Sequence, residues 1–160
     1  MPLPQRDKQI VRDLAKRVAE IAALPAQQET IALWKALNHL EPQRPMVLVD
    51  QIPWHEMDVD GALVPQTEDA SCREIETRLR RTLYAWEHMR VDMVVEPFLR
   101  IPKVILGADL GIQPVEERAV TDPANDVVGH HYLDQLQTQE DLAEIRMPRV
   151  SLDIEATALA

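Results

Sequence analysis

The chain has 160 residues and only one cysteine, Cys72. A single cysteine excludes both an internal disulfide and a cysteine-rich zinc module within this chain. Such cysteine usage favours a reducing, cytoplasmic setting. Cys72 falls on the apolar face of a predicted helix, so we expect it to pack in the core as a small hydrophobic side chain.

Long hydrophobic runs are also missing. No stretch approaches the roughly 18 apolar residues that a transmembrane helix requires. Near the N-terminus, charged residues such as Arg12, Asp13 and Lys16 stand where an export signal has its apolar segment. The sequence therefore predicts a soluble protein without a signal peptide.

Basic residues are few. Lys and Arg number 17 against 27 Asp and Glu, which gives a formal net charge of −10 at pH 7. A net negative field repels nucleic acid and anionic lipid. We therefore expect neither nucleic acid nor a membrane surface among the partners.

Apolar residues at intervals of three and four predict three long helices. The first covers residues 4–24 and ends at Pro25, and the second runs from about residue 27 to 40. The third lies between residues 68 and 89, where Ser71 and Glu74 have the spacing of a capping box. Its Arg78, Arg80 and Arg81 are expected to form a solvated, salt-bridged face rather than an anion site.

The remainder of the chain alternates short apolar stretches with prolines. Residues 91–95, 101–106 and 127–133 are expected to be strands or extended segments. Residues 138–141 predict a capping box with Asp141 in the place of Glu, which would start a short helix. Residues 154–160 favour helix but carry no helix-ending signal, so the chain is expected to stop within an element.

The most informative segment is residues 44–57. Residues 46–50 are an apolar run that predicts one buried strand, and Trp54, His55 and Glu56 follow it closely. Polar groups just past the end of a strand lie where α/β barrels place their sites. His55 with Glu56 could supply an acid/base group, a metal ligand or a hydrogen-bond donor. Alternatively they satisfy loop backbone groups while Trp54 packs on the core.

Several stretches together resemble the uroporphyrinogen decarboxylase-like superfamily, which includes corrinoid-dependent methyltransferases. They are LWKALN at 33–38 before RPMV at 44–47, IPWHEM at 52–57, ETRLRR at 76–81 and TQEDL at 138–142. The resemblance implies an α/β fold: a helical region over 1–43 and the first part of a TIM-type (β/α)8 barrel over 44–160, incomplete and helix-rich. A complete barrel typically needs about 250 residues. The chain would then be an inactive N-terminal portion of an enzyme.

Two departures from the decarboxylases bear on the reaction. Their first barrel strand is followed by a loop whose arginine grips the substrate carboxylates, whereas residues 51–57 contain no arginine. Their later aspartate corresponds to Phe98 here, with Glu96 the nearest acid. The resemblance thus favours methyl or small-group transfer over tetrapyrrole decarboxylation, so the full-length enzyme would be a corrinoid-dependent methyltransferase more readily than a lyase.

On this interpretation the candidate catalytic residues are His55, Glu56 and Glu96, and no residue of this chain is assigned to a metal. The candidate substrate-binding residues are Trp54, Phe98 and His131, with a structural histidine as the alternative for the last. The resemblance implies corrinoid and zinc as cofactors of a full-length member. It implies a small-molecule substrate or a corrinoid protein as partner, and an incomplete sheet would favour a homo-oligomer.

Two alternatives come from other classes of function. One is a self-contained acidic, α-rich module that binds a partner protein through exposed apolar helix faces. The other is a small hydrolase or metal enzyme that uses His55, Glu56 and His131.

Overall fold

The computed structural model describes residues 3–58, 60–120 and 128–159, and packing divides the chain into two units. Unit 1 is Met1–Leu99 and unit 2 is Arg100–Ala160. The sequence suggested a boundary after residue 43. In the structure the first and fourth helices, on either side of residue 43, pack against each other within unit 1.

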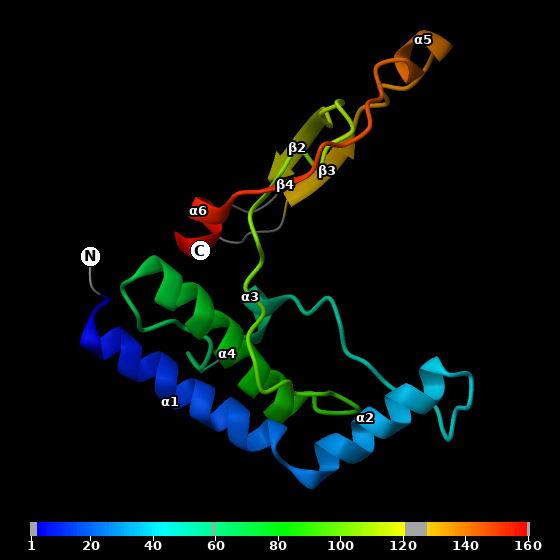
Figure 1. The fold of residues 1–160 in the computed structure, drawn as a ribbon. Helices are drawn as coiled ribbons and strands as arrows, with labels where there is room; N and C mark the ends of the chain where they lie inside the picture. Colours follow the sequence, from blue (N-terminus) through cyan, green and yellow to red (C-terminus); the bar gives the residue numbers. More distant parts are fainter. Residues whose placement is uncertain (1–2, 59, 121–127, 160) are drawn as a thin grey trace. The chain divides into compact units, whose positions relative to one another are not determined.

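The described residues of unit 1 include four helices, labelled α1 to α4 in Figure 1. They are α1 Gln5–Ala22, α2 Pro25–Asn38, α3 Trp54–Met57 and α4 Ala70–His88. The three predicted long helices are confirmed. Pro25 both follows α1 and opens α2, because the first turn of a helix has no intrahelical use for the N–H that proline lacks.

The start of α4 differs from the prediction. The helix begins at Ala70, and the side chain of Asp69 caps it by accepting the Cys72 backbone N–H at 3.0 Å. The capping box of Ser71 with Glu74 is wrong, since Ser71 already lies inside the first turn. Cys72 is buried as predicted, and burial together with nearby Asp69 raises the pKa of its thiol.

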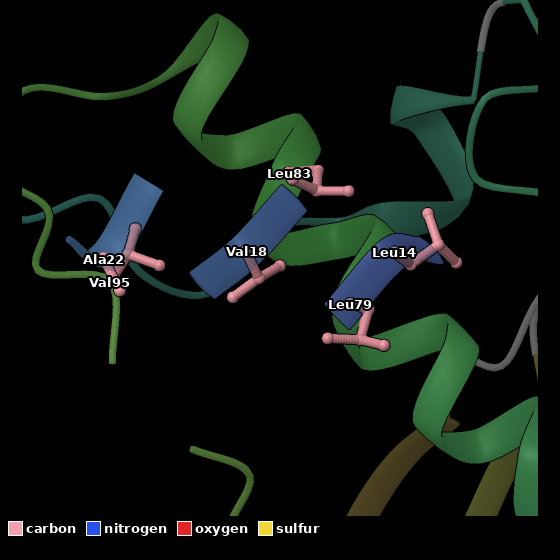
Figure 2. Close-up of a cluster of buried hydrophobic side chains, with 6 residues drawn as sticks. All are labelled: Leu14, Val18, Ala22, Leu79, Leu83 and Val95. Carbon is pink, nitrogen blue, oxygen red and sulfur yellow. The ribbon is translucent and has the colours of Figure 1, made fainter. Parts of the chain in front are cut away.

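The apolar core of unit 1 lies between α1 and α4. Figure 2 shows its six buried side chains, which α1, α4 and the segment after α4 supply: Leu14, Val18, Ala22, Leu79, Leu83 and Val95. The spacing of three and four on both helices places one stripe of each against the other. This seam is the main apolar contact of unit 1.

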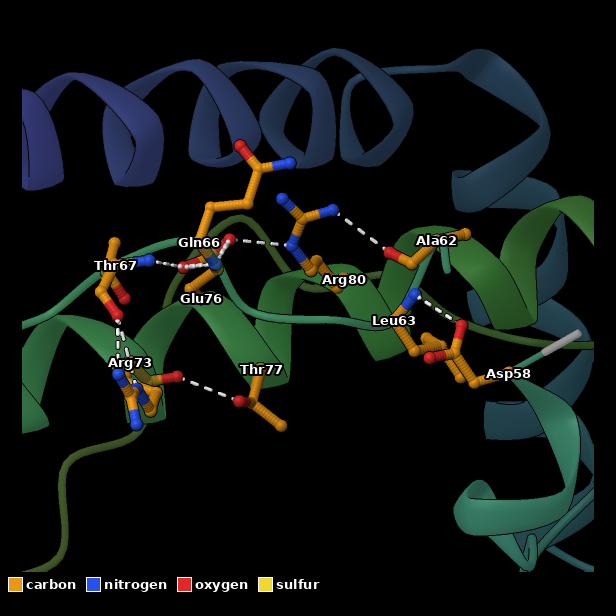
Figure 3. Close-up of polar contacts among 9 residues, drawn as sticks. All are labelled: Asp58, Ala62, Leu63, Gln66, Thr67, Arg73, Glu76, Thr77 and Arg80. Atoms are coloured by element: carbon orange, nitrogen blue, oxygen red, sulfur yellow. Dashed lines mark hydrogen bonds and ion pairs between the residues drawn. The ribbon is translucent and has the colours of Figure 1, made fainter. Parts of the chain in front are cut away.

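A buried carboxylate holds the chain before α4 onto that helix. Glu76, fully buried, accepts the backbone N–H groups of Gln66 at 2.9 Å and Thr67 at 2.8 Å, and Arg80 donates to it from Nε at 2.7 Å (Figure 3). Burial alone would raise the pKa of Glu76. These hydrogen bonds outweigh burial, so its pKa is lowered and the carboxylate stays charged.

A second buried carboxylate joins α1 to the start of α4. Asp7 is 1 % exposed and accepts the backbone N–H groups of Glu68 and Asp69, both at 2.9 Å. Four consecutive backbone N–H groups just before α4, those of residues 66–69, therefore donate to the carboxylates of Glu76 and Asp7, and the Asp69 side chain caps the helix. The entry to α4 is fixed by hydrogen bonds to charged groups, which are stronger than neutral ones.

The described part of unit 2, residues 100–120 and 128–159, forms two small antiparallel sheets and two short helices. The elements are β1 Ile105–Leu106, β2 Glu116–Val120, β3 Val128–Tyr132, α5 Gln139–Leu142, β4 Ser151–Leu152 and α6 Ile154–Leu159. β1 pairs with β4, and β2 pairs with β3 so that Glu116 lies opposite Tyr132. Val127, the first residue of the predicted segment 127–133, lies outside the described residues, as does Ala160, the last residue of the predicted helix 154–160.

The helix α5 begins as its sequence predicts. The Thr138 hydroxyl accepts the Asp141 N–H, and the Asp141 carboxylate accepts the Thr138 N–H at 2.8 Å. Aspartate thus completes the capping box in place of glutamate.

The predicted α/β class with a TIM-type barrel is wrong. Every ladder in the described residues is antiparallel and two-stranded, and all belong to unit 2. Residues 46–50 and 93–95 form no ladder, and residues 91–92, expected to be part of a strand, form a turn in which Val91 has φ 31°. One backbone bond joins the two segments, from Asp92 N–H to the Val47 carbonyl at 3.3 Å, while the Val47 N–H goes to the Asp92 carboxylate. The Asp92 side chain thus accepts the Val47 N–H, which would otherwise be available to donate to a neighbouring strand.

None of the described helices combines the length and the apolar character needed to cross a membrane.

Removing the Glu76 carboxylate is expected to destabilise unit 1. Glu76→Ala leaves two N–H groups and the Arg80 guanidinium without their partner, so we expect a loss of about 3 kcal/mol in the free energy of unfolding. Urea unfolding followed by circular dichroism at 222 nm measures it. Glu74→Ala is the matched control, since Glu74 pairs with Arg78 on the exposed side of the helix and should cost no more than about 0.5 kcal/mol. Equal losses in the two variants would contradict this role.

Candidate functional site

The residues that follow the extended segment form one turn of helix, α3, rather than the expected loop. Contacts of Tyr84 attach this turn to α4. The Tyr84 hydroxyl donates to the Met57 carbonyl at 3.0 Å, and the rings of Trp54 and Tyr84 meet edge to face with centroids 6.2 Å apart. Trp54 therefore has a defined position beside α4.

An ion pair fixes the extended segment that leads to α3. The Arg44 guanidinium donates to both carboxylate oxygens of Asp92, at 2.9 Å for one of them. The Val47 N–H donates to the same carboxylate at 2.8 Å, and Trp34 Nε1 donates to the Asp92 carbonyl at 2.8 Å. The Arg44 guanidinium and then the Val47 N–H lower the pKa of Asp92 to about 2. Asp92 thus ties residues 44–47 to the segment that follows α4.

These elements enclose a pocket of 250 Å³ on unit 1. Its walls come from residues 48–54, from α4 and from the segment after α4. The lining residues are Leu48, Val49, Ile52, Trp54, Arg81, Thr82, Ala85, Met89, Val91 and Met93. Eight of the ten have apolar or largely apolar side chains. Ligand sites typically combine such walls with a few polar groups that fix orientation.

Besides the indole N–H of Trp54, Thr82 and Arg81 supply the polar groups of this pocket. The Thr82 hydroxyl donates to the Arg78 carbonyl at 3.0 Å, so its proton is already used within α4. The Arg81 guanidinium lies over the Trp54 ring, with Cζ 5.3 Å from the ring centroid. That distance is within the range of a cation–π contact. Arg81 is therefore the charged residue of the lining and offers a ligand several N–H donors.

The predicted site residues separate in the structure. Trp54 lines the pocket, whereas His55 and Glu56 lie on the same helical turn but outside the lining. His55 Nε2 lies 3.5 Å from Glu56 Oε1, which brings an imidazole and a carboxylate together. Such a pair can accept and orient a proton.

The other three candidates lie elsewhere. Glu96 and Phe98 line a different cavity of unit 1, of 220 Å³, together with side chains of α1 and Leu79 of α4. His131 lies on β3 in unit 2, opposite Glu117. Its neighbour His130 pairs with Glu116, Nδ1 to Oε2 at 2.9 Å, and this contact lowers the pKa of Glu116.

From the sequence, Arg81 was expected to share a salt-bridged helix face with Arg78 and Arg80. In the structure it takes no part in the salt bridges of those two residues. Arg78 pairs with Glu74 and Arg80 with Glu76, each one helical turn away. The residues one turn from Arg81 are Thr77 and Ala85, which cannot pair with it. That missing acidic neighbour is a signal in the sequence that could have identified Arg81.

A zinc site does not fit the part of the chain that the structure describes. Within residues 3–58, 60–120 and 128–159, no group of three or more His, Cys, Asp or Glu side chains could hold a metal ion. No chemical step is therefore assigned to zinc in this chain.

Comparison with protein-family models, with curated proteins and with solved structures gives no significant match.

The Arg44–Asp92 ion pair gives a stability that depends on pH. Because the pKa of Asp92 falls from 3.8 to about 2 on folding, its contribution is complete above about pH 4 and is lost as the pH falls through 2. We expect wild type to have a higher urea midpoint than Asp92→Asn at pH 6, with the gap closing between pH 4 and pH 2. Asp50→Asn, at an exposed position, serves as the control. A gap that stays constant down to pH 2 would be inconsistent with this ion pair.

Proposed function

We propose that unit 1 binds a small, largely apolar molecule in the pocket beside Trp54, as the substrate site of an enzyme related to the uroporphyrinogen decarboxylase-like superfamily. The observation that carries the proposal is the pocket lining. Two stretches that resemble the superfamily, residues 52–57 and 76–81, supply facing walls through Trp54 and Arg81. Sequence segments that lie far apart in the chain thus meet at one cavity.

The size and charge of the pocket favour a small ligand. Pockets for drug-sized molecules typically measure about 300–1,000 Å³, and this one measures 250 Å³. A tetrapyrrole with several carboxylates would need more volume and more than one guanidinium. These properties support methyl or small-group transfer as the reaction class, with the His55–Glu56 pair as the nearest acid/base groups on α3.

We further propose that the protein acts in a reducing, cytoplasmic setting without nucleic acid as a partner. The buried single thiol of Cys72 and the net charge of −10 support these two points. A corrinoid protein as partner follows from the resemblance alone.

Methionine methyl NMR tests the pocket, because Met89 and Met93 line it and Met147, in unit 2, is 88 % exposed. Phenylacetamide is the probe, a neutral molecule small enough for 250 Å³. We expect saturable shifts of the Met89 and Met93 methyl resonances, with Kd of about 1 mM for ten non-hydrogen atoms, and no shift of Met147.

Ala85→Leu supplies the control for this titration. Ala85 lines the pocket, and three added carbons would fill part of it, so the shifts of Met89 and Met93 should weaken at least several-fold. The melting temperature is measured in parallel to show that the variant folds. Undiminished shifts in the folded variant, or equal shifts at Met147, would argue against binding in the pocket.

A second candidate function, partner binding, is favoured by the surface of unit 2. None of its described residues has a buried hydrophobic side chain, and large apolar residues such as Val120, Met147 and Ile154 are exposed. The chain exposes 12524 Å², whereas two separate compact domains of these lengths would expose roughly 9,700 Å². A second copy of the chain is the simplest partner that could cover this apolar surface.

Sedimentation velocity across a range of concentrations tests association. We expect the wild-type chain to self-associate and the double variant Met147→Glu, Ile154→Glu to do so at least several-fold more weakly, because a charge buried at an interface is costly. Leu40→Glu is the matched control, since Leu40 is 89 % exposed but belongs to unit 1. If Leu40→Glu weakens association equally, or if wild type stays monomeric, unit 2 is not a self-association surface.

A further inference from the structure

The three arginines between residues 78 and 81 have different partners. Arg78 and Arg80 each form an ion pair with a glutamate of the same helix. Among the described residues, the Arg81 guanidinium has no hydrogen bond or ion pair, and its contact is the face of Trp54. A guanidinium carries five N–H donors in a planar fork. The contact with the ring positions that plane and leaves the donors unused.

The position of Arg81 would bring those donors to a ligand bound in the pocket. Arg81 lies in the wall of an otherwise apolar pocket, where a bound ligand would meet both the fork and the hydrophobic side chains. Water is partly excluded at such a site once a ligand binds, which strengthens a charge-assisted hydrogen bond.

The cavity lining around Arg81 differs in charge from the lining around Arg90, which also lies over a tryptophan ring. Arg90 lies over Trp86 with Cζ 4.1 Å from the ring centroid, but the cavity that they line also contains Glu20 and Glu87. The pocket beside Arg81 contains no acidic residue in its lining. In a chain with a net charge of −10, this lining offers an anion one cation and no acidic side chain among the other nine lining residues.

We propose that the ligand of this pocket is a small monocarboxylate with an apolar body, whose carboxylate pairs with the Arg81 guanidinium while its body lies among Leu48, Ile52 and Met93. This inference rests on the proposed function, because it names the class of ligand for the same pocket. One guanidinium matches one carboxylate in a bidentate geometry, which is why a single acidic group is specified.

A pair of ligands of equal size tests the inference. Phenylacetate and phenylacetamide differ in the acid group, and titration with either is followed through the methyl resonances of Met89 and Met93. We expect wild type to bind phenylacetate about ten-fold more tightly than phenylacetamide, since hydrogen bonds to a charged group contribute more than neutral ones.

Two variants with the same change of charge locate the effect. Arg81→Gln should reduce the preference for phenylacetate to about two-fold or less, while Arg78→Gln, one turn away and paired with Glu74, should keep it. Arg81→Lys keeps the charge but not the planar fork, so an intermediate preference is expected.

The outcomes separate this inference from the function on which it rests. Binding of the two ligands with equal affinity to wild type, or an equal loss of preference in Arg78→Gln and Arg81→Gln, overturns the carboxylate inference and leaves the pocket in place. Failure of both ligands to bind overturns the pocket itself.

Discussion

The arrangement of unit 1 depends on the buried carboxylate of Glu76. It accepts two backbone N–H groups from the chain before α4 and the Nε–H of Arg80 within α4 (Figure 3). Because these donors compensate its burial, the group stays charged in a place where an unpaired charge would be strongly unfavourable. The chain between α3 and α4 is thereby fixed at one end, which limits where α3 can lie. Tyr84 then holds the other end through the Met57 carbonyl.

The pocket follows from this arrangement together with a second ion pair. Asp92 receives Arg44 and the Val47 N–H, so the extended segment before α3 lies beside the segment after α4. Trp54 is therefore positioned by contacts on both sides of it along the chain. A binding site needs rigid support of this kind, since affinity falls when a ligand must order the side chains it meets. The α1–α4 seam (Figure 2) gives α4 itself a firm base.

The sequence predicted the long helices, the buried Cys72 and the capping box at Thr138, because each depends on neighbours within a few residues. Prediction from the sequence failed where the structure of a segment depends on a residue far away along the chain. Residues 46–50 have the composition of a strand, but the carboxylate of Asp92, 45 residues after Val47, takes the N–H that a ladder would use. Of the candidate site residues taken from the sequence, Trp54 alone lines the pocket. Arg81 was missed because its contact with Trp54 crosses 27 residues of sequence and has no spacing rule.

The contrast between the two units bears on where function resides. Unit 1 buries an apolar core and three carboxylates, Asp7, Glu76 and Asp92, while no described residue of unit 2 buries a hydrophobic side chain. Isolated two-stranded sheets are marginally stable in water, so the pairing of β2 with β3 alone would give unit 2 little stability. A site that must hold a ligand in one geometry therefore belongs in unit 1. The exposed apolar residues of unit 2 are better suited to being covered by another surface, which would stabilise its strands in the same step.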